Sequence, residues 1–204
     1  MRKNKIKKIP IFVDGLLATN ITEVFRNSAE YFDELTAKAF LNSGDPFGYE
    51  NVTYVKDVNS SKKIHDITKP IILISASGMC ENGRILHHLK NNIENPKNTV
   101  VVTGFMAKDT LGKRIVERSK TVRIFGRIYE LNSEVVTINA FSSHADKSGL
   151  INYIKGAGKE VKKVFLVHGE PEQLNALRSN LRRKLNISPY VPAKDETVYL
   201  KAGD

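Results

Sequence analysis

Short apolar runs alternate with longer amphipathic segments in the first half of the chain. The runs, rich in β-branched residues, are 9–14, 52–55, 70–74 and 99–104. Each is long enough for one strand. Apolar residues at three- and four-residue spacing predict helices from Thr19 or Thr22 to about Leu41, with one buried stripe, and from about Arg84 to Ile93. This alternation predicts a parallel α/β sheet, with 70–74, the most apolar run, as its central strand.

The second half of the chain is richer in strands. Val164–Val167, four apolar residues bounded by Gly169 and Pro171, predicts a buried strand in a parallel or mixed sheet. Paired strands are predicted on either side of Gly126. The further predicted elements are strands at 134–138, 187–191 and 197–200, a short helix from about Leu111, a helix at 147–155 capped by Asp146 or Ser148, and a helix at 171–185.

Composition narrows the class of protein. The 204 residues are 41% hydrophobic and 26% charged, as in soluble globular proteins. No 18 apolar residues run together, so the sequence predicts no transmembrane helix, and the apolar segment after the basic start is too short for a signal peptide. We therefore expect a cytoplasmic protein with no membrane partner. The single Cys80 excludes an internal disulfide and a cysteine-rich metal site.

Positive charge is concentrated in three segments. The formal net charge is +10, and residues 1–8 carry five basic groups and no acid. Residues 108–127 carry seven basic groups against two acidic ones, and residues 159–184 carry seven against three. Solubility alone does not require such clustering. A charge excess of this size favours polyanions such as RNA, DNA or an anionic membrane surface, and the three segments favour a partner with a phosphate backbone, whose binding should weaken steeply with salt.

Two histidines stand where predicted strands give way to helices. His168 follows the run 164–167, and His144 follows the run 135–138 within Phe141–Asp146. Ligands in layered α/β folds bind at the carboxyl ends of strands, although a lone histidine there can equally be structural. The small-residue turn Ser75–Cys80 is a possible phosphate or carboxylate site, without a GxGxxG or Walker pattern. Of the other histidines, His65 is predicted to be exposed and structural, and one of His87 and His88 to face the sheet.

Six motifs together resemble the C-terminal portion of a β-CASP metallo-β-lactamase RNA-processing nuclease. The chain is similar in this respect to cleavage and polyadenylation specificity factor-like exonucleases. The motifs are IPIFVDGLLA (9–18), ILISASGMCENGRILHHLKN (72–91), TVVVTGFMAKDTLGKRI (99–115), VRIFGRIYELNSEV (122–135), FSSHAD (141–146) and VHGE (167–170). The resemblance implies a basic segment at 1–8, a Rossmann-like β-CASP domain at 9–125, and part of an αββα metallo-β-lactamase sandwich at 126–204.

The resemblance also implies roles for individual residues. Members of the family hydrolyse RNA phosphodiesters with two zinc ions. His168 would bind one zinc, and His144 would contact the scissile phosphate and protonate the leaving oxygen. Asp146 and Glu170 would orient the imidazoles. The implied phosphate contacts are Ser77, Gly78, Ser142 and Ser143.

One departure from the family is large: the HxHxDH zinc motif is absent from the sequence. One imidazole cannot hold a catalytic zinc, which takes three protein ligands. The sequence therefore predicts a fragment or truncated product that needs an N-terminal metallo-β-lactamase half, with an exposed apolar surface that favours a homodimer. The alternatives are a non-catalytic RNA-binding module or subunit and an unrelated Rossmann-like nucleotide binder. Retention of both histidines argues against the first, and the lack of a glycine-rich fingerprint against the second.

Overall fold

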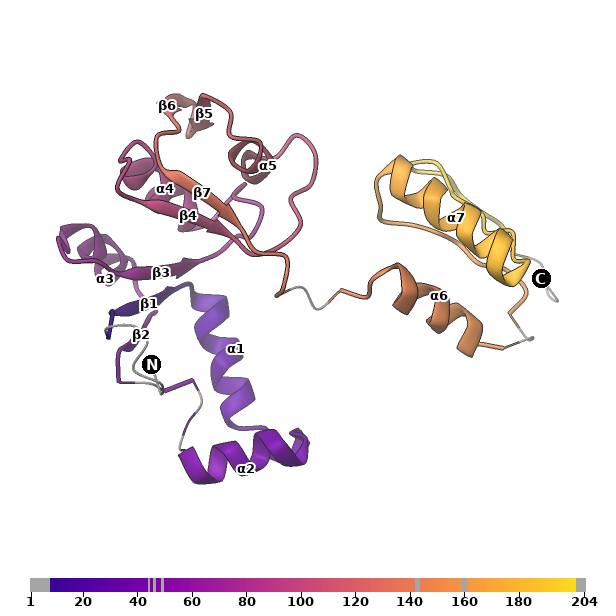
Figure 1. Cartoon of the computed structure of the whole chain (residues 1–204), viewed down its shortest axis with the longest axis horizontal. Coiled ribbons are helices and arrows are strands. Elements are labelled where there is room, and N and C mark those ends of the chain that lie inside the picture. The colour runs from indigo at the N-terminus through magenta and orange to yellow at the C-terminus, as the bar shows by residue number, and fades with distance from the viewer. Residues whose placement is uncertain are drawn as a thin grey trace. The chain divides into compact units, whose positions relative to one another are not determined.

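The computed structural model describes residues 8–43, 45, 47–48, 50–141, 144–158 and 161–200. The chain divides into two compact units, 1–142 and 143–204, called unit 1 and unit 2 below (Figure 1). Both contain helices, and unit 1 contains the parallel strands, so the predicted α/β class is confirmed. None of the helices within these described ranges is long and apolar enough to cross a membrane.

Unit 1 contains a three-stranded parallel sheet in the order β2–β1–β3. The strands are β1 (Ile11–Asp14), β2 (Val52–Val55) and β3 (Ile72–Ser75). Val13 of β1 lies opposite Tyr54 on one side and Ile74 on the other. The prediction that the most apolar run is central is therefore wrong. β1 is central, and β3 lies at the edge of this sheet with Ile72 and Ile74 exposed.

Two further strand pairs complete unit 1. β4 (Thr99–Val102) pairs in parallel with β7 (Glu134–Thr137). β5 (Thr121–Ile124) and β6 (Arg127–Glu130) form the predicted antiparallel pair, joined at Phe125 and Gly126, whose φ angles of 48° and 78° suit a tight hairpin. α4 (Ile85–Asn92) and α5 (Leu111–Val116) flank these strands. A cluster of buried residues packs here: Cys80, Leu89, Ile93, Leu111, Ile115, Val122, Ile124 and Val135.

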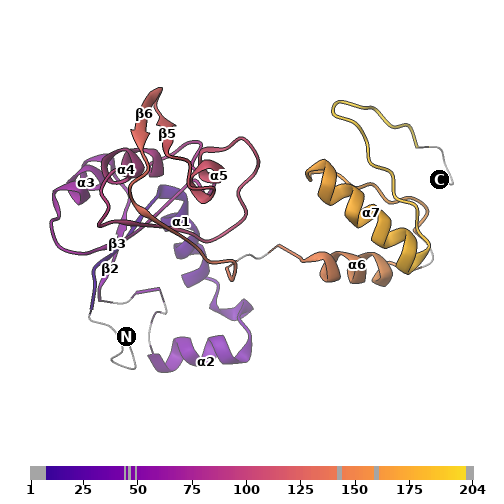
Figure 2. The same cartoon turned by 45° about the horizontal axis from the view of Figure 1, so that its top comes forward.

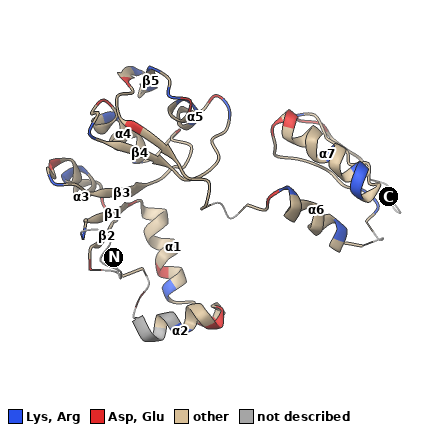
Figure 3. Ribbon diagram, viewed as in Figure 1, with Lys and Arg blue, Asp and Glu red and all other residues tan. Residues whose placement is uncertain are grey.

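The helix predicted up to about Leu41 is broken in two. α1 (Leu16–Arg26) has Gly15 as its N-cap residue, earlier in the chain than the predicted caps Thr19 and Thr22. A 3-10 turn at Ala29–Tyr31 separates α1 from α2 (Glu34–Ser43). Part of the predicted buried stripe is exposed, against the prediction: Val24 is 62% exposed and Leu35 82%. Figure 3 shows α1 almost without charge along this length. α3 (Val58–Lys63) and a 3-10 turn at Ile64–Asp66 follow β2.

Unit 2 is built on two helices. α6 (Lys147–Gly156) and α7 (Pro171–Leu185) lie side by side in both views (Figures 1 and 2). Ile151, Leu166 and Leu181 form its buried core. The strands predicted at 164–167, 187–191 and 197–200 are reduced to one parallel bridge between Phe165 and Tyr190. Val167 is 63% exposed, so the prediction of a buried strand there is wrong.

Candidate functional site

His168 lies on an unusual backbone at the surface of unit 2. Its φ is 59°, in the left-handed region that few residues other than glycine adopt, and its side chain is exposed. The next residue, Gly169, allows the turn to pack against α7, because a β-carbon there would meet the side chain of Leu174 at 3.0 Å. Glu170 is the N-cap residue of α7 and is half-buried. The turn thus presents the imidazole to solvent directly before the helix.

His144 is also exposed on unit 2, two residues before the cap of α6. The cap is Asp146, whose Oδ1 accepts a hydrogen bond from the Gly149 amide at 2.7 Å. The predicted capping by Asp146 is therefore confirmed, and its expected role in orienting an imidazole stays a prediction. Ser142 and Ser143 lie outside the described residues.

Ser77 and Gly78 lie in unit 1, in the loop after β3. The Ser77 hydroxyl donates to the carbonyl of Asn82 at 3.2 Å. A β-carbon built at Gly78 would meet no atom within 4 Å, so the chain itself leaves this position open. Glu81 fixes the loop to the start of α5, because its Oε1 accepts the Leu111 amide at 2.5 Å. The loop is anchored at its far end and accessible at Gly78.

A buried polar cluster in unit 1 was missed by the sequence analysis. Asp14, at the end of β1, is 0% exposed. Its Oδ1 accepts from Arg84 Nη1 at 2.5 Å, and its Oδ2 accepts from Ser61 Oγ at 2.5 Å and lies 2.6 Å from His88 Nε2. An aspartate that ends an apolar strand was the available signal, because a buried carboxylate needs partners. We call these four residues the Asp14 cluster.

Electrostatics hold the carboxylate of this cluster in its charged form. Burial alone would raise the pKa of Asp14, but the hydrogen bonds from Ser61, Arg84 and His88, together with the guanidinium charge, hold it below its usual value. Arg84 also donates to the carbonyls of Val55 and Lys56 at 3.1 and 2.7 Å. The cluster therefore ties β1, β2, α3 and α4 together.

The other histidines divide as follows. His88 is 3% exposed and His87 is exposed, which confirms that one faces inward and one outward. His65 is half-buried with its ring centroid 4.9 Å from that of His88, so the prediction that it is exposed is wrong. Burial, with a smaller contribution from the neighbouring His88, lowers the pKa of His65. His65 and His88 thus pack against each other in the interior of unit 1, whereas His87 lies at its surface.

The described residues do not form a complete metal site. Within them, no three His, Cys, Asp or Glu side chains are grouped as metal ligands. A catalytic zinc takes three protein ligands. The arrangement can offer one exposed imidazole at His168, and it does not fit a zinc ion held by this part of the chain alone.

Two sequence profiles match the chain. The profile of the Zn-dependent metallo-hydrolase RNA specificity domain matches residues 128–192, the segment that carries His144 and His168. This match indicates the class of metallo-hydrolases. The profile of the Beta-Casp domain matches residues 1–115, more than half of the 204 residues. The chain therefore belongs to the β-CASP family, and the resemblance drawn from the six motifs is confirmed.

The curated relatives that the chain matches include proteins named as ribonucleases and as transcription termination factors. The chain is 33% identical over 174 residues to Ribonuclease TTHA0252 of Thermus thermophilus, a match that covers 85% of this chain and 39% of the relative. It is 29% identical over 206 positions to Transcription termination factor FttA of Methanosarcina mazei, a match that covers 98% of this chain and 32% of the relative. An RNase J-like protein of Methanocaldococcus jannaschii is 30% identical over 194 residues, covering 95% and 44%. The chain thus spans less than half the length of these relatives.

Proposed function

We propose that the chain takes part in the hydrolysis of RNA phosphodiesters, as the part of a β-CASP nuclease that carries His144 and His168. The observation that carries the proposal is that both imidazoles are exposed on one compact unit, inside the segment matched by the RNA-specificity profile. The ribonuclease relative supports the same reaction. The basic segments at 108–127 and 159–184 supply charge for the RNA backbone.

Each histidine has its own role in this proposal. His168 serves as one ligand of a zinc ion, and Glu170 orients its imidazole. A further polypeptide segment supplies the other ligands, since the described residues offer no set of three. His144 contacts the scissile phosphate and protonates the leaving oxygen, because imidazole can carry or release a proton near neutral pH.

The loop after β3 contributes phosphate contacts in the same proposal. Ser77 offers a hydroxyl, and the open space at Gly78 lets a phosphate approach the backbone closely. Ser142 and Ser143 would add further hydroxyl contacts. Gly78→Ala should therefore weaken RNA binding with little loss of stability, because the added β-carbon meets no atom within 4 Å and lies in the space that the phosphate would occupy.

A graft tests the proposal. This chain replaces the matched region of the Thermus ribonuclease, and cleavage of labelled single-stranded RNA is measured with zinc or manganese. We expect metal-dependent cleavage that His168→Ala abolishes and that His144→Ala lowers roughly 100-fold or more. His87→Ala, the same change at an exposed histidine of unit 1, should leave the rate unchanged. Equal cleavage by the His168→Ala graft would contradict the proposal.

A second candidate is a non-catalytic RNA-binding subunit. The lack of a three-ligand group among the described residues favours it. The two candidates differ in the graft: a binding subunit would bind RNA with steep salt dependence, and neither His144→Ala nor His168→Ala would change any rate.

A further inference from the structure

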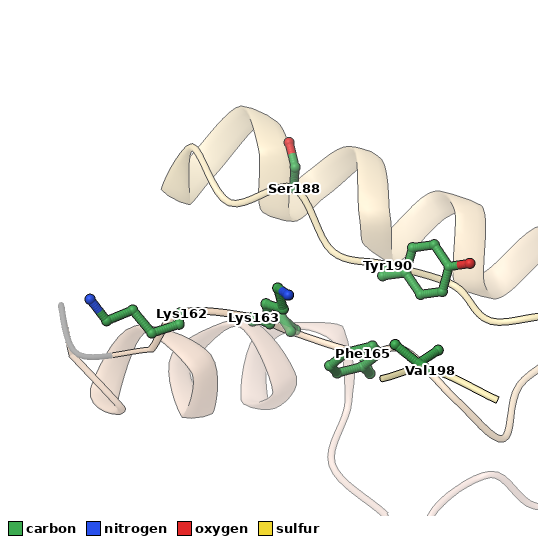
Figure 4. A pocket seen from close by; sticks show the side chains of 7 residues that line it. Lys162, Lys163, Phe165, Ser188, Tyr190 and Val198 are labelled. Carbon is green, nitrogen blue, oxygen red and sulfur yellow. The ribbon is translucent and has the colours of Figure 1, made fainter. Parts of the chain in front are cut away.

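Unit 2 contains a small pocket that the proposed reaction does not use. It has a volume of about 250 Å³ and is lined by Lys162, Lys163, Val164, Phe165, Ser188, Tyr190 and Val198. In Figure 4 the two lysines lie toward one end, whereas Phe165, Tyr190 and Val198 lie toward the other. This volume is below the 300–1,000 Å³ typical of pockets for drug-sized ligands, so it suits a group smaller than such a ligand.

The aromatic end of the pocket is held in place by the surrounding chain. The rings of Phe165 and Tyr190 meet edge to face, with centroids 6.0 Å apart and an interplanar angle of 79°. The Tyr190 hydroxyl donates to Glu196 Oε1, and Glu196 Oε2 accepts the Ala193 amide at 2.7 Å. Both carboxylate oxygens of Glu196 therefore help to hold the Tyr190 side of the pocket in place. Tyr190 keeps 45% of its surface exposed, which leaves its ring accessible.

The charged end continues into the most basic part of unit 2. Arg182, Arg183 and Lys184 occupy the last turn of α7, four to six residues before Ser188, and Figure 3 shows this positive end of the helix. An aromatic wall beside ammonium groups suits a flat ring attached to an anion. A nucleotide has both parts, whereas inorganic phosphate and acidic peptides have only the anion.

We propose that this pocket binds one base of a single-stranded RNA, which stacks on Tyr190 while the adjoining phosphates contact Lys162 and Lys163. The inference rests on the proposed function and adds a subsite to it. Phe165 lies three residues before His168, so their α-carbons are at most about 11 Å apart. An RNA strand that reaches His168 can therefore also reach the pocket.

The test is binding of a labelled single-stranded RNA decamer to the intact chain in EDTA, followed by fluorescence anisotropy. Lys162→Gln/Lys163→Gln should reduce the slope of log affinity against log salt by about 1.4. Lys62→Gln/Lys63→Gln, the same change in an adjacent lysine pair of unit 1, should bind as the wild type. Tyr190→Leu should weaken binding about 5- to 100-fold through lost stacking, whereas Tyr190→Phe keeps the ring and should retain the affinity.

Competition and a second variant guard against misfolding of Tyr190→Leu. Ser188→Asp places a negative charge in the exposed wall of the pocket and should weaken binding without touching the core. Adenosine monophosphate should compete with the RNA, and ribose 5-phosphate, inorganic phosphate and polyglutamate should not. Equal competition by polyglutamate, or wild-type affinity in both the lysine and Tyr190→Leu variants, would overturn the subsite. The proposed function would still stand if the His168→Ala graft lost cleavage.

Discussion

The two units differ in the burial of their polar side chains. Unit 1 buries a carboxylate, a hydroxyl and an imidazole in the Asp14 cluster and surrounds them with paired strands. Among its described residues, unit 2 has a buried core of three residues and one strand bridge, and it exposes both His144 and His168. The Asp14 cluster of unit 1 thus serves stability, whereas the two histidines of unit 2 are accessible to solvent. The following variants test this division, from the largest expected effect to the smallest.

Asp14→Asn should have the largest effect. It leaves the guanidinium of Arg84 beside a neutral group in a buried site, and removal of one partner from such a pair costs about 3–5 kcal/mol. Urea unfolding followed by circular dichroism would measure the loss. Asp66→Asn, the same change at an exposed position nearby, is the control. Equal midpoints for both variants would show that the Asp14 cluster does not stabilise unit 1.

Leu181→Ala should come next and should act on unit 2. Leu181 is fully buried, and its truncation leaves a cavity that costs about 2–3 kcal/mol in a core small enough to collapse partly around it. We expect α6 and α7 to unfold at lower urea concentration while unit 1 keeps its transition. Leu200→Ala, at an exposed leucine of the same unit, should shift neither transition.

Asp146 separates stability from chemistry within unit 2. Asp146→Ala removes the cap of α6 and should cost about 1 kcal/mol, whereas Asp146→Asn keeps a capping oxygen and should be nearly neutral. If the carboxylate also orients an imidazole, the Asn variant should retain its midpoint and lose cleavage in the graft. Full cleavage by Asp146→Asn would restrict Asp146 to capping.

The smallest effect concerns the pH dependence of unit 1. Since the pKa of His65 is lowered on folding, the unfolded chain takes up the proton first, and stability should fall as the pH drops below 6.5. His65→Gln should flatten this step. A second loss is expected below pH 3.8, where the unfolded chain protonates Asp14 before the folded one does. A midpoint that is constant between pH 7 and 5 in the wild type would contradict the first step.

Local sequence patterns predicted most of the helices and strands. They failed where pairing with residues distant in the sequence determines the structure. The β5–β6 pair, the cap of α6 and the proline at the start of α7 follow from nearby residues. The order of the first sheet does not: β1 is central because it pairs with β2 and β3, and the apolar content of a run does not show its neighbours. Val164–Val167 has strand composition, yet the described residues provide it with one bridge.

The candidate site shows the same limit. His144 and His168 were found because each belongs to a short motif after an apolar run. The Asp14 cluster was missed because the three partners of Asp14 lie 47 to 74 positions from it in sequence. The pocket is lined by residues that precede α7 in the sequence and by residues that follow it. From the sequence, its two lysines could be assigned only to the basic segment 159–184. Residue spacing in the sequence identifies short motifs. Clusters of residues that are distant in the sequence can be identified only from the folded structure.

The bridge between Phe165 and Tyr190 has a consequence for amide hydrogen exchange. Only two backbone hydrogen bonds span it among the described residues, Leu166 to Tyr190 and Tyr190 to Val164, each 2.8 Å long. Amides in ladders exchange through unfolding, whereas those at a lone bridge exchange through local opening. Deuterium should therefore enter residues 164–167 and 187–191 well before β1. A strand from another polypeptide that docks along this segment would slow its exchange, and the protected amides would mark where that strand lies.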